Sequence, residues 1–358
     1  MSEKSDAGRE ALLAGRLGEA RELLESVLAD EADNIAVRTD LSWACYRAND
    51  FARATSAFHE LPGMEPLAAK LRSFGDELPY QMDGPAKTAL PFALTDPLPV
   101  VQISVEGVDI HVLIDTGGAE LILDAEFAEE IGVDLFGSQE ATLAGGKKTS
   151  LAQGRVEHIM LGEIGIWRVP VHVASVRAFS SVTGGRYRID GIIGTSLLAQ
   201  FCATVDYPDH RLVLARPGTS EDVQGEEVVF QTWLDHYMIA EGWLNGQGPL
   251  RFFVDSGLVG GAFTCPARTL EAAGVDVPEV KVQPGIGGEY KMAAFEIVEL
   301  GLGPLRQQHL TGLYIEPAVE APPDSDGPRW DGLISHGFLR KYRWTIDAAR
   351  SVFVFQEP

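Results

Sequence analysis

Two short motifs place an acidic side chain where it could do chemistry. The tripeptide Asp-Thr-Gly occupies 115–117 after the apolar run 112–114, and Asp-Ser-Gly occupies 255–257 after the mostly apolar run 250–254. A carboxylate at the end of a buried strand is costly unless a hydrogen bond or a reaction uses it. A following glycine permits a tight turn or a close backbone approach. The two motifs therefore predict two acidic turns of one kind, each at the end of a strand.

The spacing between these motifs recurs along the chain. The sequence numbers of Asp115 and Asp255 differ by 140, and those of four further pairs of landmarks differ by 139 to 142. These pairs are Asp190 and Asp331, Val205-Asp206 and Ile346-Asp347, Gly145-Gly146 and Gly287-Gly288, and Leu161-Gly162 and Leu300-Gly301. Short apolar runs separated by turns give both copies a β texture. A near-constant offset at five landmarks predicts that the C-terminal 260 or so residues are two copies of one β-rich unit.

This duplicated pattern resembles that of the aspartic peptidases over about residues 98–356. The size of each copy is similar to a retropepsin lobe, and two lobes in one chain are similar to the pepsin arrangement. The resemblance implies a mainly β fold, with two tandem β-barrel lobes related by pseudo-twofold symmetry. It also implies an endopeptidase that needs no cofactor and no metal.

The resemblance assigns a role to each residue of the two motifs. Asp115 and Asp255 would be the catalytic pair, because two carboxylates about 3 Å apart share one proton and can activate a water between them. The supporting residues would be Thr116 and Ser256, whose hydroxyls brace the two turns, and Gly117 and Gly257, whose backbones approach the carboxylates. The ψ-loops that pass beneath the turns would contain Ile193 and Gly194 in the first lobe and Ile334 and Ser335 in the second.

A hairpin in each lobe is expected to cover the cleft as a flap. Glycine pairs at the tips suit a mobile lid over an extended peptide. The flap and substrate-binding residues would be Gly145, Gly146, Gly287, Gly288 and, as the aromatic flap residue, Tyr290, for which an exposed loop position is the alternative.

The sequence departs from the family pattern at three positions. Gly118 and Leu258 follow the two motifs where pepsin-like enzymes have a hydroxyl, and Ser335 replaces the ψ-loop glycine of the second lobe. Loss of a hydroxyl that favours the charged carboxylate predicts a pair that titrates higher than in gastric enzymes. These departures leave two alternatives open: an inactive peptide-binding scaffold with the same fold, and a peptidase whose pair forms from Asp115 of two chains.

The N-terminal segment differs from the rest of the chain. Residues 7–73 have helical spacing, and Leu17, Ala20 and Leu24 match Phe51, Ala54 and Phe58, with sequence numbers that differ by 34 within each pair. This period resembles the tetratricopeptide repeat, and the alternative is a plain helical hairpin. In either case we expect a surface that docks a protein partner or recruits a substrate.

Composition defines the remaining expectations. We expect a helical domain at 1–75, a linker at 76–97, a first peptidase lobe at 98–217 and a second at 218–358. A net charge of -23 argues against nucleic acid and membrane as partners, and leaves a peptide or protein substrate. Three scattered cysteines and a polar N-terminus favour a cytoplasmic protein. We expect a monomer, with a dimer as the alternative.

Overall fold

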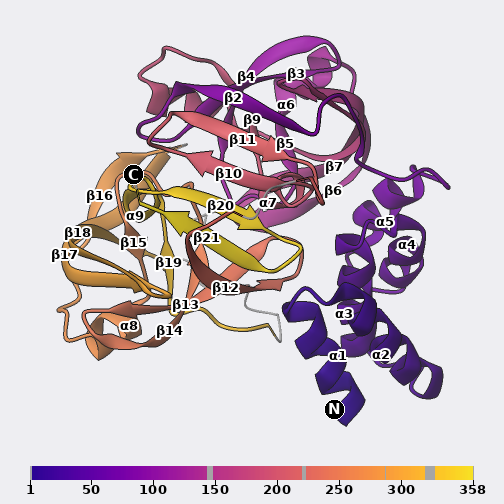
Figure 1. The fold of residues 1–358 in the computed structure, drawn as a ribbon, viewed down its shortest axis with the longest axis horizontal. Coiled ribbons are helices and arrows are strands. Elements are labelled where there is room, and N and C mark those ends of the chain that lie inside the picture. The colour runs from indigo at the N-terminus through magenta and orange to yellow at the C-terminus, as the bar shows by residue number, and fades with distance from the viewer. Residues whose placement is uncertain (1, 143–147, 220–222, 287, 319–326, 358) are drawn as a thin grey trace.

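A computed structural model describes residues 2–142, 148–219, 223–286, 288–318 and 327–357. A run of helices comes first and packs beside two β-rich lobes (Figure 1). The first lobe lies at the top of Figure 1 and the second at the lower left, with the strands that join them between the two. The predicted fold class, a mainly β chain of two lobes behind a helical segment, is confirmed.

The helical segment consists of antiparallel neighbours joined by short turns. Its helices are α1 (Glu3–Leu13), α2 (Leu17–Asp30), α3 (Ile35–Arg47), α4 (Phe51–His59) and α5 (Glu65–Arg72). Leu17 and Phe51, which the helical period relates, are the first residues of α2 and α4. Asp50 caps α4, because its side chain accepts a hydrogen bond from the Arg53 N–H. The repeat in the sequence is therefore a repeat of helix starts.

In the described residues, the first lobe contains strands β1 to β11 and a few short helical segments. The strands are β1 (Gln81–Asp83), β2 (Lys87–Leu94), β3 (Val100–Val105), β4 (Val108–Ile114), β5 (Leu121–Asp124), β6 (Asp134–Thr142), β7 (Lys148–Leu161), β8 (Ile164–Ala174), β9 (Ile189–Ile193), β10 (Cys202–Asp206) and β11 (Arg211–Ala215). The helical segments are α6 (Ala125–Glu130), η2 (Arg177–Thr183) and α7 (Thr195–Leu198).

Where the structure describes it, the second lobe contains strands β12 to β21 and the short helices α8 and α9. The strands are β12 (Glu226–Trp233), β13 (Tyr237–Leu244), β14 (Gln247–Val254), β15 (Phe263–Thr264), β16 (Lys281–Gly285), β17 (Gly288–Leu302), β18 (Leu305–Glu316), β19 (Gly332–Ile334), β20 (Arg343–Asp347) and β21 (Val352–Gln356). The helices are α8 (Ala267–Ala272) and α9 (His336–Leu339).

The two lobes repeat one pattern of strand pairing. In the first lobe β4 runs parallel to β9, with Ile114 opposite Ile193. In the second lobe β14 runs parallel to β19, with Val254 opposite Ile334. β5 and β15 each pair antiparallel with the strand that carries the ψ-loop. The duplication in the sequence is thus a duplication of topology.

A central sheet joins the lobes. Its antiparallel strands follow the order β2, β11, β10, β20, β21 and β12. Thr204 of β10 lies opposite Thr345 of β20, and their Oγ1 atoms are 2.8 Å apart. Because the numbers of these threonines differ by the same offset as the other landmarks, they are copies of each other, and each lobe meets its equivalent here. This self-matching contact is what a pseudo-twofold axis requires.

Residues 76–97, predicted as a linker, contain two strands. β1 pairs with β8, and β2 pairs with both β3 and β11. β2 is therefore an outer strand of the central sheet and contributes directly to the first lobe.

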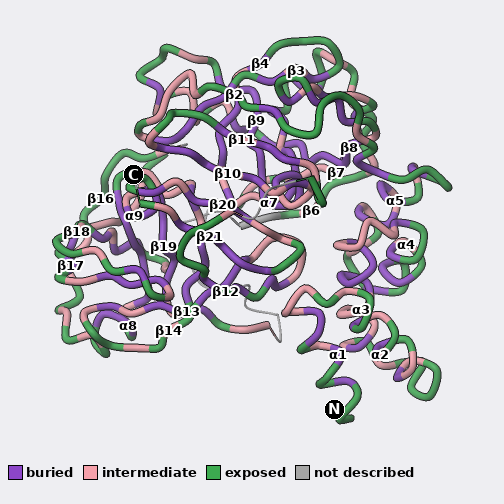
Figure 2. Tube along the Cα trace, in the orientation of Figure 1, coloured by how far each residue is buried: buried purple, intermediate pink, exposed green. Residues whose placement is uncertain are grey.

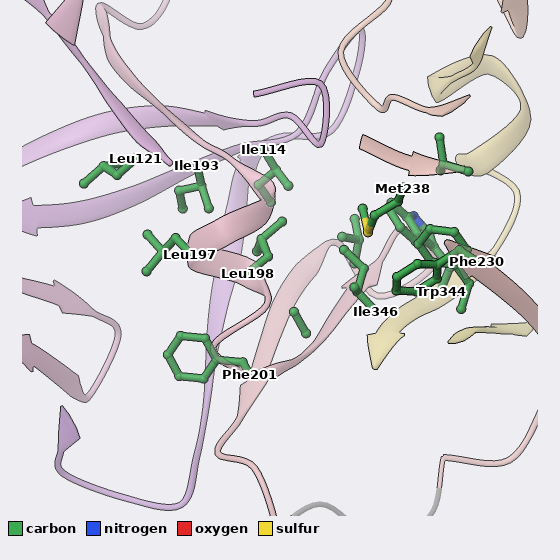
Figure 3. Packing of buried hydrophobic residues seen from close by; sticks show 14 of the residues in the cluster. Ile114, Leu121, Ile193, Leu197, Leu198, Phe201, Phe230, Met238, Trp344 and Ile346 are labelled. Atoms are coloured by element: carbon green, nitrogen blue, oxygen red, sulfur yellow. The ribbon is translucent and has the colours of Figure 1, made fainter. Parts of the chain in front are cut away.

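The lobes have apolar interiors that fix the strand ends. Buried residues run along the strands of both lobes, and exposed residues are concentrated in peripheral loops and turns (Figure 2). Ile114, Ile193, Leu197 and Leu198 gather around α7 (Figure 3), and all are buried. β4 is therefore anchored at its last residue, Ile114, immediately before Asp115 and the acidic turn. Within the described ranges, no helix has the length and apolar character needed to span a membrane.

Candidate active site

The two acidic turns sit at equivalent strand ends. Asp115 follows β4, and its N–H donates to the Ile193 carbonyl oxygen at 3.0 Å. Asp255 follows β14, and its N–H donates to the Ile334 carbonyl oxygen at 3.0 Å. Each aspartate is thus held by the parallel strand beside it, which leads into the ψ-loop.

Thr116 and Ser256 brace the turns reciprocally. The Thr116 N–H donates to Ser256 Oγ at 3.0 Å, and the Ser256 N–H donates to Thr116 Oγ1 at 3.0 Å. The Thr116 hydroxyl also donates to the Val254 carbonyl oxygen at 2.9 Å. Both side chains are buried, so these bonds fix the lobes to one another at the motif itself.

The carboxylates lie against each other's turns. Each accepts a hydrogen bond at 2.8 Å from the N–H two residues later, Gly117 for Asp115 and Gly257 for Asp255. A Cβ atom on Gly117 would lie 2.5 Å from Asp255 Oδ1, and one on Gly257 would collide with the Asp115 carboxylate. Only glycine leaves room for this approach, in which each carboxyl group lies against the turn of the other lobe.

The electrostatics of the pair are asymmetric. Burial raises the pKa of Asp115 above its usual value, while the hydrogen bond from Asp255 partly opposes the shift. Burial and the nearby charge of Asp115 raise the pKa of Asp255 well above its usual value. These directions make Asp255 the more readily protonated member, while the two carboxyl groups titrate as one coupled pair.

The ψ-loops differ at one position but keep the same path. The Gly194 N–H donates to the Glu120 carbonyl oxygen at 3.0 Å, and the Ser335 N–H donates to the Ala262 carbonyl oxygen at 2.9 Å. Ser335 has extended backbone dihedrals that any residue adopts. Its hydroxyl donates to the Asp255 carbonyl oxygen and accepts from the Leu258 N–H at 3.0 Å. The serine thus ties the second turn together at the position where the first lobe has glycine.

The predicted flap residues are only partly described. Gly145, Gly146 and Gly287 lie outside the described residues. Gly288 begins β17, and Tyr290 lies opposite Gln283 in the hairpin of β16 and β17. The Tyr290 hydroxyl donates to the Ile286 carbonyl oxygen at 2.7 Å, so the ring folds back along its own hairpin.

Sequence reasoning missed a buried polar cluster beside the first turn. Glu120, five residues after Asp115, forms an ion pair with Lys70 of α5 and accepts a hydrogen bond from Tyr46 of α3. The signal was Lys70 itself, a charged residue among the buried Leu67, Ala68 and Leu71 on the inner face of α5. Across the described ranges, no group of three His, Cys, Asp or Glu side chains is arranged to hold a metal ion.

Parts of this chain match two protein-family models and a solved structure. Residues 101–197 match the aspartyl protease family. Residues 11–73 match the tetratricopeptide repeat model, in accord with the helical period. A solved structure, described as a retropepsin-like aspartic protease from Rickettsia conorii, is 19% identical, with a TM-score of 0.26, over 38% of this chain and 94% of that one. No curated protein matches the chain.

Proposed function

We propose that this protein is an aspartic endopeptidase that hydrolyses peptide bonds with a water activated between Asp115 and Asp255. The observation that carries the proposal is the mutual approach of the two turns, in which each glycine lies against the other lobe's carboxylate. The aspartyl protease match over residues 101–197 supports it independently.

The asymmetry of the pair gives each carboxyl group a role. Ionised Asp115 accepts a proton from the water, and the hydroxide attacks the carbonyl carbon of the scissile bond. Protonated Asp255 donates its proton to the carbonyl oxygen, which gives a neutral tetrahedral diol. When the diol collapses, the proton on Asp115 passes to the leaving nitrogen, the C–N bond breaks, and Asp255 takes a proton back from one diol hydroxyl, which leaves an amine and a carboxylic acid as products. The cycle needs no covalent intermediate.

The wider architecture suggests how a substrate is held. An extended peptide would lie between floor and flaps and would bind through main-chain hydrogen bonds. The hairpins β6–β7 and β16–β17 are the candidate flaps: Gly288 and Tyr290 lie in the second, while Gly145, Gly146 and Gly287 fall in the sequence between the paired strands and lie outside the described residues. The tetratricopeptide-like segment would recruit a particular protein or peptide in the cytoplasm, which favours a processing enzyme over a digestive one.

The experiment is cleavage of a mixed peptide library, followed by mass spectrometry of the products. We expect cleavage that a statine-type transition-state mimic blocks and that Asp115→Asn and Asp255→Asn both abolish. Asp331→Asn is the matched control, because Asp331 accepts a hydrogen bond from the Arg251 N–H in the same lobe, away from the pair. Binding of peptides without turnover by the parent protein would favour the inactive scaffold instead.

A further inference from the structure

The helical segment reaches the acidic turn through one buried carboxylate. Glu120 and Lys70 are both fully buried. The Lys70 Nζ atom lies 2.7 Å from Glu120 Oε1 and 2.7 Å from Oε2, and the Tyr46 hydroxyl donates to Oε1. Two helices of the N-terminal segment therefore converge on a residue that immediately precedes β5.

The backbone around Glu120 is part of the hydrogen-bonding frame of the acidic turn. The Glu120 carbonyl oxygen accepts from Gly194, while Ala119 accepts from Ser196 at 2.7 Å and Gly118 from Thr195 at 2.9 Å. The next carbonyl back along the ψ-loop, that of Ile193, accepts from the Asp115 N–H at 3.0 Å. A shift of Glu120 would therefore pass directly to the loop that holds the aspartate.

A second chain of hydrogen bonds also connects the helical segment to the first ψ-loop. The Asn49 side chain, just after α3, donates to Gln200 Oε1 at 2.9 Å. Gln200 in turn donates to the Ser196 carbonyl oxygen at 3.0 Å. The helical segment thus holds the first ψ-loop at both ends of α7.

The chemistry of the cluster argues for more than adhesion between domains. Burial opposes charge on both partners. It lowers the pKa of Lys70, and at Glu120 it is outweighed only by the nearby Lys70 and His172 together with the hydrogen bonds from Lys70 and Tyr46, which lower the pKa of Glu120. His172 lies 3.7 Å from Glu120, and burial lowers the pKa of His172 to about 4, so this histidine is neutral near neutral pH. Apolar side chains would join the domains without this desolvation cost, whereas a buried ion pair fixes one geometry.

We propose that Lys70 and Tyr46 are positioning residues for the peptidase reaction, which hold Glu120 and thereby set the geometry of the first ψ-loop and of Asp115. The proposal rests on the proposed function for its catalytic consequence. It makes the helical segment part of the active-site framework, in addition to any role in recruitment.

The test uses the full chain with four variants. Tyr46→Phe removes one hydrogen bond, Lys70→Met leaves the Glu120 carboxylate without its ion-pair partner, and Lys70→Met with Glu120→Gln removes both charges while keeping the shape. Arg21→Met is the control, because it breaks an ion pair of 3.3 Å to Asp50 inside the same helical segment. Two measurements are made: hydrogen exchange of peptides covering 115–120 and 193–196, and kcat per active site titrated with a statine-type mimic.

We expect faster exchange at 115–120 and 193–196 in Lys70→Met and Tyr46→Phe, and unchanged exchange there in Arg21→Met. We expect kcat per titrated site to fall by about tenfold to a hundredfold in Lys70→Met, with KM nearly unchanged and a partial recovery in the double variant. Unchanged exchange and unchanged kcat in both Tyr46→Phe and Lys70→Met would overturn the proposal.

The two proposals fail separately. If the parent protein cleaves no peptide, the proposed function fails, and the exchange rates alone still decide whether Lys70 and Tyr46 hold the turn. If Lys70→Met does not fold, Tyr46→Phe and the charge-free double variant carry the same comparison.

Discussion

Asp115 and Asp255 have equivalent hydrogen bonds but unequal tendencies to ionise. Each accepts from the glycine N–H two residues later, and burial raises the pKa of both, further at Asp255, where the charge of Asp115 adds to the effect of burial. A pair of this kind works with one proton, since the base must be charged and the acid must not be. Gly118 and Leu258, which supply no hydroxyl to the pair, are consistent with this upward shift.

The pH dependence of activity follows from these directions. On the acid side, activity falls when Asp115 takes up a proton, at a pKa above the usual 3.8. On the alkaline side, activity falls when Asp255 loses the shared proton, at a pKa well above the usual 3.8. We expect a bell-shaped profile of kcat/KM displaced toward neutral pH, measured from about pH 3 to about pH 9. A profile confined to strong acid would contradict this.

The same shift predicts an effect on stability. The folded pKa of Asp255 lies above its unfolded value, so its contribution to stability is complete below about pH 3.8 and is lost as the pH rises toward the folded pKa. Asp255→Asn is therefore expected to be more stable than the parent at neutral pH, by about 1.4 kcal/mol per unit of raised pKa. Urea unfolding at several pH values measures this, with Asp331→Asn as the control. An Asp255→Asn variant less stable than the parent at pH 7 would refute the assignment of a raised pKa to this buried carboxyl group.

At the scale of elements, the ψ-loops show two solutions to one packing problem. A Cβ atom on Gly194 would lie 2.6 Å from the carbonyl oxygens of both Gly118 and Ala119, so the first lobe needs glycine. The second lobe accommodates Ser335 at this position. The Ser335 hydroxyl forms side-chain hydrogen bonds to the acidic turn, which a glycine could not form. The sequence alone could not show that the second lobe tolerates Ser335, because the position of the facing carbonyl groups is not written in the motif.

Gly194 gives a direct prediction at this scale. Gly194→Ala is expected to lower the free energy of unfolding by about 1–3 kcal/mol and to reduce kcat, because the contacts are with backbone that cannot move aside. Gly118→Ala is the matched control, since its nearest contact is the end of the Ile122 side chain at 3.3 Å. Denaturant unfolding and kcat for both variants decide the matter, and equal stability of the two would contradict the packing argument.

The elements that the sequence predicted best are those with a strong local signal. Apolar strands ending in Asp-Thr-Gly or Asp-Ser-Gly, and helix starts that recur with a fixed period, carry their pattern in neighbouring residues. β2 was missed because it contains Pro91, which normally argues against a paired strand, and because its partner β11 lies far along the chain. Long-range pairing of this kind leaves no local trace.

At the scale of the molecule, the pair is assembled within a single chain. The turns brace each other through Thr116 and Ser256, and the central sheet joins their lobes through Thr204 and Thr345. Lys70 and Glu120 are 50 residues apart in the sequence and belong to different domains, so neither the helical repeat nor the acidic motif could predict their contact. The helical segment and the first lobe are thus connected by chemistry that only the assembled fold displays.

Assembly within one chain predicts the result of a mixing experiment. Asp115→Asn and Asp255→Asn, each inactive, should stay inactive when combined at equal concentration, because no chain then holds both carboxyl groups. The parent should show activity proportional to its concentration. Recovery of cleavage on mixing would instead support a pair formed by Asp115 of one chain and Asp255 of another, and activity of Asp255→Asn alone would support a pair formed from Asp115 of two chains.

The central claim is that Asp115 and Asp255 act as one hydrolytic unit. The most direct test is kcat/KM of the parent, of Asp115→Asn, of Asp255→Asn and of the double variant on a single peptide. Substitutions of residues that act as a unit have strongly non-additive effects. The kcat/KM of each single variant should therefore fall by at least about a thousandfold, and that of the double variant should fall no further than that of a single variant. If either single variant keeps kcat/KM within about tenfold of the parent, the account is wrong.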